Sequence, residues 1–145
     1  MPIAQPRLEH ANIVVADIAP TLAFLKAAFP DWRVRGEGVG DWYGKPRRWL
    51  HFGDENNYIT LNDNGDGPWR DLQAHQSGLA HIGFEVPSLG TVQENLERAG
   101  FKISHHGEDH PHRRNLYFID DSGLEFEFTE YFSDAADEKN HYQTR

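Results

Sequence analysis

Residues 10–18 read HANIVVADI, and residues 81–89 read HIGFEVPSL. Each segment opens on a histidine, continues with the apolar alternation of a strand, and closes in a helix-start signal. A helical pattern follows each of them, over Pro20–Phe29 and over Leu89–Ala99, and Ser88 is the expected N-cap of the second. The chain therefore begins the same strand and helix twice, and this internal repeat decides the fold.

The repeat continues beyond the helices. Residues 47–54 (RRWLHFGD) match residues 113–120 (RRNLYFID). A turn-rich segment and a second alternating strand follow each copy, at residues 58–61 and 124–128. One module is thus a strand, a helix and two or three further strands, and the sequence predicts an α+β fold with two modules.

A length of 145 residues corresponds to one domain of ordinary size. We expect a single domain over residues 1–132, with module 1 at about 7–64 and module 2 at about 78–132. The polar stretch 133–145 lacks apolar periodicity and is expected to be a frayed tail or a short terminal helix.

The composition excludes several classes of protein. The chain has no cysteine, which rules out disulfide scaffolds, thiolate metal sites and cysteine nucleophiles. Its formal net charge of −9 disfavours binding to nucleic acid and to anionic membranes. It has no apolar run of membrane-spanning length and no secretory signal at residues 1–10. We therefore expect a soluble, cytoplasmic protein.

Strand alternation places three potential metal ligands on the faces opposite the helices. His10 and His81 occupy the same position in the two copies, and Glu127 lies between Phe126 and Phe128, which are expected to face the helix. Two imidazoles and one carboxylate form the facial triad of non-haem Fe(II) oxygenases. The alternative is that each is an ordinary structural or surface residue, and the repeat favours the metal.

These residues resemble the vicinal oxygen chelate superfamily, which contains glyoxalases, bleomycin resistance proteins and extradiol dioxygenases. Three segments carry the resemblance: LEHANIVVADI (8–18), LAHIGFEVPSL (79–89) and LYFIDDSGLEFEFTEY (116–131). The third departs from the family signature at Asp121, where proline is usual. The resemblance implies two βαβββ modules that form a U-shaped cleft around a divalent metal ion.

In this family the ligands come from the first and fourth strands of each module. The corresponding positions are His10, Thr60, His81 and Glu127. Glyoxalase I has a carboxylate where this chain has Thr60, so three protein ligands are expected. That set resembles extradiol dioxygenases and fosfomycin-modifying enzymes, and Fe2+ is the favoured ion, with Mn2+, Ni2+ or Zn2+ as alternatives.

The expected partner is a small-molecule substrate with vicinal oxygens, and the expected chemistry is that of a dioxygenase or of a glyoxalase-like lyase or isomerase. His51 and Tyr117 are candidate catalytic residues, although each also suits a passive position at the rim or wall of the cleft. The resemblance also implies a homodimer, and it leaves open whether the cleft forms within one chain or between two.

Two other functions stay open: a metal-free protein that binds an antibiotic, as in bleomycin resistance, and a fosfomycin-type metal-dependent transferase. The loop at residues 104–114 (SHHGEDHPHRR) is rich in histidine. It is either a second metal site or mobile lid, or a solvated polar loop. Arg113 or Arg114 could meet a substrate carboxylate, or either could form a surface ion pair.

Overall fold

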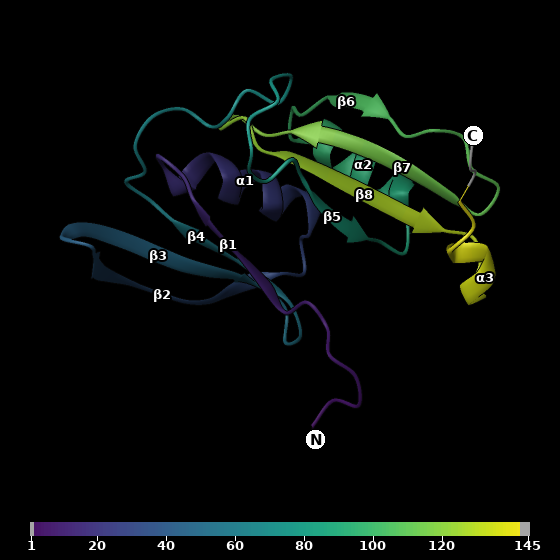
Figure 1. Ribbon diagram of the computed structural model, residues 1–145, viewed down its shortest axis with the longest axis horizontal. Coiled ribbons are helices and arrows are strands. Elements are labelled where there is room, and N and C mark those ends of the chain that lie inside the picture. Colours follow the sequence, from purple (N-terminus) through teal and green to yellow (C-terminus); the bar gives the residue numbers. More distant parts are fainter. Residues whose placement is uncertain (1, 143–145) are drawn as a thin grey trace. The chain divides into compact units, whose positions relative to one another are not determined.

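The computed structural model describes residues 2–142 and contains the expected module twice (Figure 1). The first module consists of β1 (His10–Val14), α1 (Ile18–Ala28), β2 (Arg33–Trp42), β3 (Lys45–Gly53) and β4 (Tyr58–Asn62). Its four strands form one sheet in the order β1-β4-β3-β2. The pair β1/β4 is parallel, and the other two pairs are antiparallel.

The second module repeats this arrangement. It consists of β5 (Ile82–Glu85), α2 (Leu89–Arg98), β6 (Ile103–His106), β7 (Arg113–Ile119) and β8 (Glu125–Tyr131). The sheet order is β5-β8-β7-β6, again with a parallel first pair. The α+β fold with two βαβββ modules is therefore confirmed.

Both helices begin at the expected kind of residue. The side chain of Asp17 accepts a hydrogen bond from the backbone N–H of Ala19, and the Ser88 side chain accepts one from Thr91. Such caps satisfy N–H groups that have no partner inside the helix. Helix α2 ends before Gly100, which adopts a positive φ of 96° that glycine tolerates at no steric cost.

Each sheet buries the face that the alternation predicts, and in β4 the polar residues Thr60 and Asn62 of the other face are buried as well. In β8 the side chains of Phe126 and Phe128 are fully buried, and in β7 those of Leu116 and Phe118 are too. Helix α2 covers this face of the sheet (Figure 1). In the first module Leu50, Phe52, Ile59 and Leu61 are buried in the same way. Polar residues of the same strands are left on the opposite faces.

The turn between β7 and β8 is held by a buried carboxylate. The Oδ1 atom of Asp120 accepts hydrogen bonds from the backbone N–H groups of Ser122 (2.8 Å) and Leu124 (3.0 Å). Asp120 is only 4% exposed. Water therefore cannot easily replace this acceptor, and the turn sets the register that brings Glu125 and Glu127 into position.

We expect Asp120→Ala to lower the free energy of unfolding by about 2–3 kcal/mol, because it leaves two backbone donors without their acceptor. Asp121→Ala is the matched control, since Asp121 is exposed and its loss should cost less than about 0.5 kcal/mol. Urea denaturation of the two variants makes the comparison. Equal effects would show that the buried acceptor does not stabilise the turn.

The chain divides into two compact units, of which the first ends at Trp69 and the second begins at Arg70. The expected tail contains one short helix, α3 (Ala136–Lys139), and residues 143–145 lie outside the described part. No described helix is long and apolar enough to cross a membrane.

Candidate metal and substrate site

His81 and Glu127 lie together in the second unit. The Nε2 atom of His81 is 2.9 Å from Oε2 of Glu127, and their side chains are 34% and 17% exposed. The strand was expected to open on His81, and β5 begins one residue later, at Ile82, so that His81 directly precedes it. Gly83 of β5 pairs with Glu127 of β8. These two potential metal ligands are in contact on the polar face of the sheet, so both could bind the same ion.

Neighbouring side chains orient this pair. The amide of Asn115 donates hydrogen bonds to Oε1 of Glu127 (2.5 Å) and to Oγ1 of Thr129 (2.9 Å). On the other side of the imidazole, Nδ1 of His81 lies 3.6 Å from Oε1 of Glu125. Metal-binding histidines commonly direct their second ring nitrogen at a carboxylate, which fixes the tautomer and leaves the first nitrogen free for the ion.

Tyr117 borders the same pair. Its ring lies edge-on to His81, with 5.5 Å between the ring centroids, and it stacks on His105 at 4.2 Å. Burial raises the pKa of the Tyr117 phenol to about 12, and the charge of Glu127 and a hydrogen bond to it act in the same direction. The phenol is therefore protonated at neutral pH and can act as a hydrogen-bond donor.

The raised pKa of Tyr117 predicts a late step in an alkaline titration of tyrosine absorbance. The phenol should ionise near pH 12, well above the usual value of about 10. Because the folded state holds this proton more tightly, the linked stability is complete below about pH 10 and is lost as the pH rises toward 12. Tyr117→Phe should remove the late step, and Glu127→Gln should move it to lower pH.

Tyr58→Phe serves as the control for this titration. The pKa of Tyr58 is also raised, by burial and by the charge of Glu9, but Tyr58 lies in the other unit. Its replacement should leave the step near pH 12 intact. A late step that persists in Tyr117→Phe would contradict the assignment.

In the first unit His10 belongs to a group of aromatic and acidic side chains. Its Nδ1 atom is 2.9 Å from Oε1 of Glu9, and its ring stacks on Tyr58 at 4.8 Å. The ring of His51 also stacks on Tyr58, with 4.6 Å between the ring centroids. The guanidinium of Arg35 lies 4.3 Å from the centre of the same tyrosine ring. His10 and His51 therefore share Tyr58 as a neighbour.

The surroundings of His51 favour its neutral form. Burial lowers its pKa, and the guanidinium of Arg35 lowers it further. A neutral imidazole can accept a proton, which is what a general base must do.

The strand registers relate the two units position by position. His51 pairs with Thr60 across β3 and β4, and Tyr117 pairs with Glu127 across β7 and β8. Thr60 therefore occupies the position in the first module that Glu127 occupies in the second. It is buried and offers only a hydroxyl, so the first module contributes no carboxylate at this position.

The expected ligands are thus divided between the units. The described residues of either unit contain no group of three or more histidine and acidic side chains arranged to hold a metal ion. The second unit brings His81 and Glu127 together, with Tyr117 beside them. The first unit provides His10, with His51 beside the shared tyrosine.

A cavity of about 540 Å³ opens beside Glu127 in the second unit, a size typical of small-molecule sites. The exposed-face residues of β7 and β8 line it, together with the loop 107–110 and Tyr142. The alternating strand residues on that face are Arg113, Asn115 and Tyr117 from β7, and Glu127, Thr129 and Tyr131 from β8.

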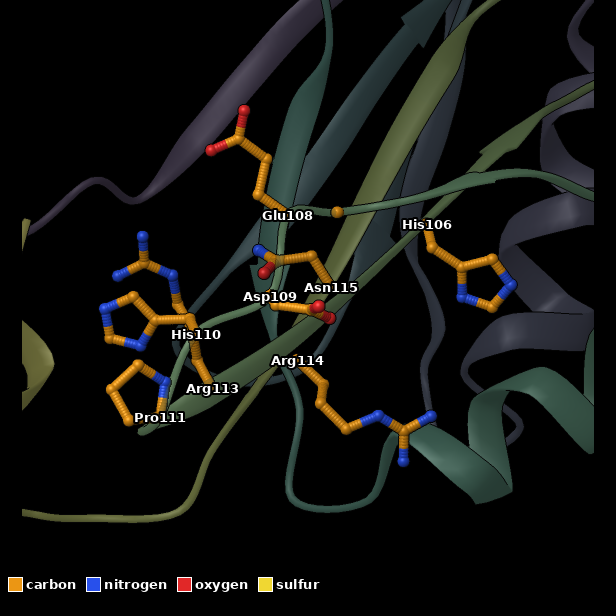
Figure 2. A pocket seen from close by; sticks show the side chains of 9 residues that line it. His106, Glu108, Asp109, His110, Pro111, Arg113, Arg114 and Asn115 are labelled. Carbon is orange, nitrogen blue, oxygen red and sulfur yellow. The ribbon is translucent and has the colours of Figure 1, made fainter. Parts of the chain in front are cut away.

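The histidine-rich loop borders a second cavity of about 550 Å³, which Figure 2 shows. Its histidines have separate partners. His105 stacks on Tyr117, Nε2 of His110 contacts the carbonyl oxygen of His141 at 2.7 Å, and Nδ1 of His112 lies 2.8 Å from Glu138. His110 and His112 thus connect the loop to the C-terminal segment.

Sequence reasoning did not single out Asn115, Thr129 or Glu125 as parts of the site. The sequence pattern indicated part of this, because alternation placed Glu125 and Asn115 on the polar face of the sheet. The contact of Glu125 with His81 depends on the parallel pairing of β5 with β8, and the contacts of Asn115 with Glu127 and Thr129 depend on the antiparallel register of β7 with β8. Alternation reveals neither pairing.

A protein-family model covers most of the chain. The family model described as "Glyoxalase/Bleomycin resistance protein/Dioxygenase superfamily" matches residues 7–128. No curated protein sequence matches the chain.

Similar folds occur among solved structures. A glyoxylase/bleomycin resistance protein/dioxygenase domain from Frankia sp. EAN1pec has 22% identity and a TM-score of 0.71, over 95% of this chain and 100% of that one. A glyoxalase family protein from Bacillus cereus has 14% identity and a TM-score of 0.71, over 91% and 100%. The fosfomycin resistance protein FosX from Listeria monocytogenes, complexed with Mn(II) and sulfate, has 21% identity and a TM-score of 0.63, over 97% and 100%.

Proposed function

The chain belongs to the glyoxalase/bleomycin resistance protein/dioxygenase superfamily, and we propose that it is a divalent-metal-dependent enzyme. Its substrate is a small molecule that chelates the ion through two adjacent oxygens. The proposed ligands are His10, His81 and Glu127. The chemistry is that of an extradiol dioxygenase, or of a glyoxalase-like lyase or isomerase, and iron is the favoured metal.

The observation that carries this proposal is the distance of 2.9 Å between Nε2 of His81 and Oε2 of Glu127. Two donors that each lie about 2.1 Å from one ion, at right angles, are about 3.0 Å apart. The two atoms are therefore close enough to bind one divalent ion. The hydrogen bonds from Asn115 and the carboxylate of Glu125 supply the outer support that such ligands need.

A bound ion would act as a Lewis acid and a template for the chelating oxygens. The residues of the chain would orient the ligands and exchange protons with the substrate. Asn115 holds Oε1 of Glu127, and Oε2 faces Nε2 of His81, where the two atoms would bind the ion. Tyr117 holds its proton at neutral pH and can donate a hydrogen bond to a substrate oxygen beside Glu127. His51 is held neutral and can accept a proton from the substrate.

Anaerobic purification followed by elemental analysis tests the proposal. The wild type is compared with His10→Ala and Glu127→Ala. Stoichiometric iron in the wild type alone supports the dioxygenase chemistry and leads to catechol-type substrates in an oxygen electrode. Manganese, nickel or zinc in the wild type alone supports the metal site with isomerase, lyase or transferase chemistry instead.

Metal content in the wild type no higher than in the two variants would overturn the proposal. A metal-free binding protein of the bleomycin-resistance type would then be the leading function.

A fosfomycin-type transferase is the second candidate, and one observation favours it. The fold is similar to that of FosX, a fosfomycin resistance protein that was crystallised with Mn(II). Manganese in the elemental analysis, together with protection of bacteria against fosfomycin on expression of this chain, would support this function over ring cleavage.

A further inference from the structure

Arg113 lies on the same sheet face as the proposed ligand Glu127. On β7 and β8 the register pairs are Tyr117 with Glu127, Asn115 with Thr129, and Arg113 with Tyr131. Arg113 lies four residues before Tyr117, the partner of Glu127, which corresponds to about 13 Å along the strand. An arginine side chain spans several ångströms, so a compact molecule can reach from Glu127 to its guanidinium.

Arg113 has no acidic partner. None of the lysine and arginine ion pairs among residues 2–142 includes its guanidinium, which lies 5.9 Å from the centre of the Tyr142 ring. Other cations of the chain do have such partners, among them Lys45, Arg48, Arg98 and Lys139. In a chain with a net charge of −9, a half-buried arginine without a carboxylate is free to bind an anion.

The cavity around Arg113 suits an anionic ring. Arg113 is the one lysine or arginine among the described residues that line it, and Tyr131 and Tyr142 provide flat apolar surface. The acidic residues Glu108 and Asp109 belong to the same lining but are exposed. They belong to the loop that follows β6, whereas Arg113 projects from strand β7.

Arg114 offers an internal comparison. It follows Arg113 directly, and the two side chains leave β7 in opposite directions (Figure 2). Arg114 is exposed and does not line the cavity beside Glu127. Of the two arginines that could bind a substrate carboxylate, Arg113 lines this cavity and Arg114 does not.

We propose that Arg113 binds an oxyanion of the substrate, so that the substrate class is a small molecule with vicinal oxygens at one end and a carboxylate or similar anion at the other. The inference rests on the proposed function, because it assumes that the vicinal oxygens bind at the ion held by Glu127. The guanidinium would hold the anion by charge-assisted hydrogen bonds.

The test compares two probes that differ by one carboxylate, catechol and 3,4-dihydroxybenzoate. Their dissociation constants are measured by calorimetry on the Mn(II)-loaded wild type, Arg113→Gln and Arg114→Gln. The ratio of the two constants cancels changes that affect both probes alike. We expect the preference for 3,4-dihydroxybenzoate to fall about tenfold or more in Arg113→Gln and to change less than about twofold in Arg114→Gln.

A preference that is unchanged in Arg113→Gln, or lost equally in Arg114→Gln, would overturn the proposal while leaving the metal site intact. A second measurement tests the anion site if the protein does not retain Mn(II). Benzoate is titrated into the metal-free wild type, and the arginine Nε–Hε resonances are followed by NMR. The resonance of Arg113 should shift with saturation and that of Arg114 should not. Absence of an Arg113 shift would contradict the anion site independently of the metal.

Discussion

His81→Ala is expected to lose most of the bound metal ion while the chain stays folded. The imidazole provides one of the three proposed protein ligands, and its Nε2 atom lies 2.9 Å from the carboxylate that provides the next. Changes in the groups that merely orient a ligand cost about 10–100-fold in metal affinity. Removal of a ligand itself should therefore exceed about 100-fold.

The fold should tolerate this substitution. The side chain of His81 is 34% exposed, and its removal leaves no cavity in the core. Glu127 keeps the hydrogen bonds from Asn115 and Thr129. The thermal unfolding midpoint of the metal-free variant should therefore stay close to that of the metal-free wild type.

Two further variants make the metal-binding measurement specific. His75→Ala removes an exposed histidine from the connection between the modules and should leave the affinity unchanged. Asn115→Ala removes the donor that orients Glu127 and should weaken binding by about 10–100-fold. Stoichiometric metal in dialysed His81→Ala would refute the ligand assignment.

The strands that the sequence predicted differ in burial from those that it missed, and not in their position in the sheet, because β1 and β5 are edge strands too. The strands around His10, His81 and the two Arg-Arg segments have one face that is more buried than the other, so their apolar residues alternate. Strands β2 and β6 lie at the sheet edges (Figure 1), and most of their residues are exposed on both faces. An edge strand with no buried face carries no alternation, and the sequence RVRGEGVGDW therefore gave no strand signal.

The candidate site was predictable to a similar degree. Alternation alone placed Glu127 and Tyr117 on the polar face, because Phe126, Phe128 and Phe118 had to be buried. The contact between His81 and Glu125 could not be predicted in this way. It depends on the parallel register of two strands that are far apart in the sequence, and no local pattern encodes such a register.

Gly53→Ala is expected to destabilise the first unit strongly. Gly53 ends β3 and is paired with Tyr58 at the start of β4. A Cβ atom at this position would lie 2.1 Å from the carbonyl oxygen of Asn57 and 2.5 Å from Cα of Tyr58. Both are backbone atoms, so the added methyl group cannot be accommodated by rotation of a side chain.

The clash occurs where the turn is already fixed by hydrogen bonds. The backbone N–H of Asp54 donates to the carbonyl of Asn57 (2.9 Å), and the Asp54 carboxylate accepts from the N–H groups of Asn56 and Asn57. The chain must break part of this network to admit the methyl group. We expect a loss of about 3 kcal/mol or more in the free energy of unfolding, at the upper end of overpacking effects.

Gly40→Ala is the matched control. Gly40 lies in the neighbouring strand β2, and a Cβ atom there would meet nothing within 4 Å. The same substitution should change the free energy of unfolding by less than about 1 kcal/mol. Chemical denaturation of both variants provides the values, and a Gly53→Ala protein as stable as Gly40→Ala would contradict the prediction.

The effect should also reach the proposed site, because the displaced residue is Tyr58. Its ring is the shared neighbour of His10 and His51, so a shift of the Tyr58 backbone moves the surface on which both imidazoles stack. In a Gly53→Ala protein that still folds, the NMR resonances of the His10 and His51 rings should therefore shift. Those of His81, which lies in the other unit beside Glu127, should not, and this contrast separates a local displacement from general unfolding.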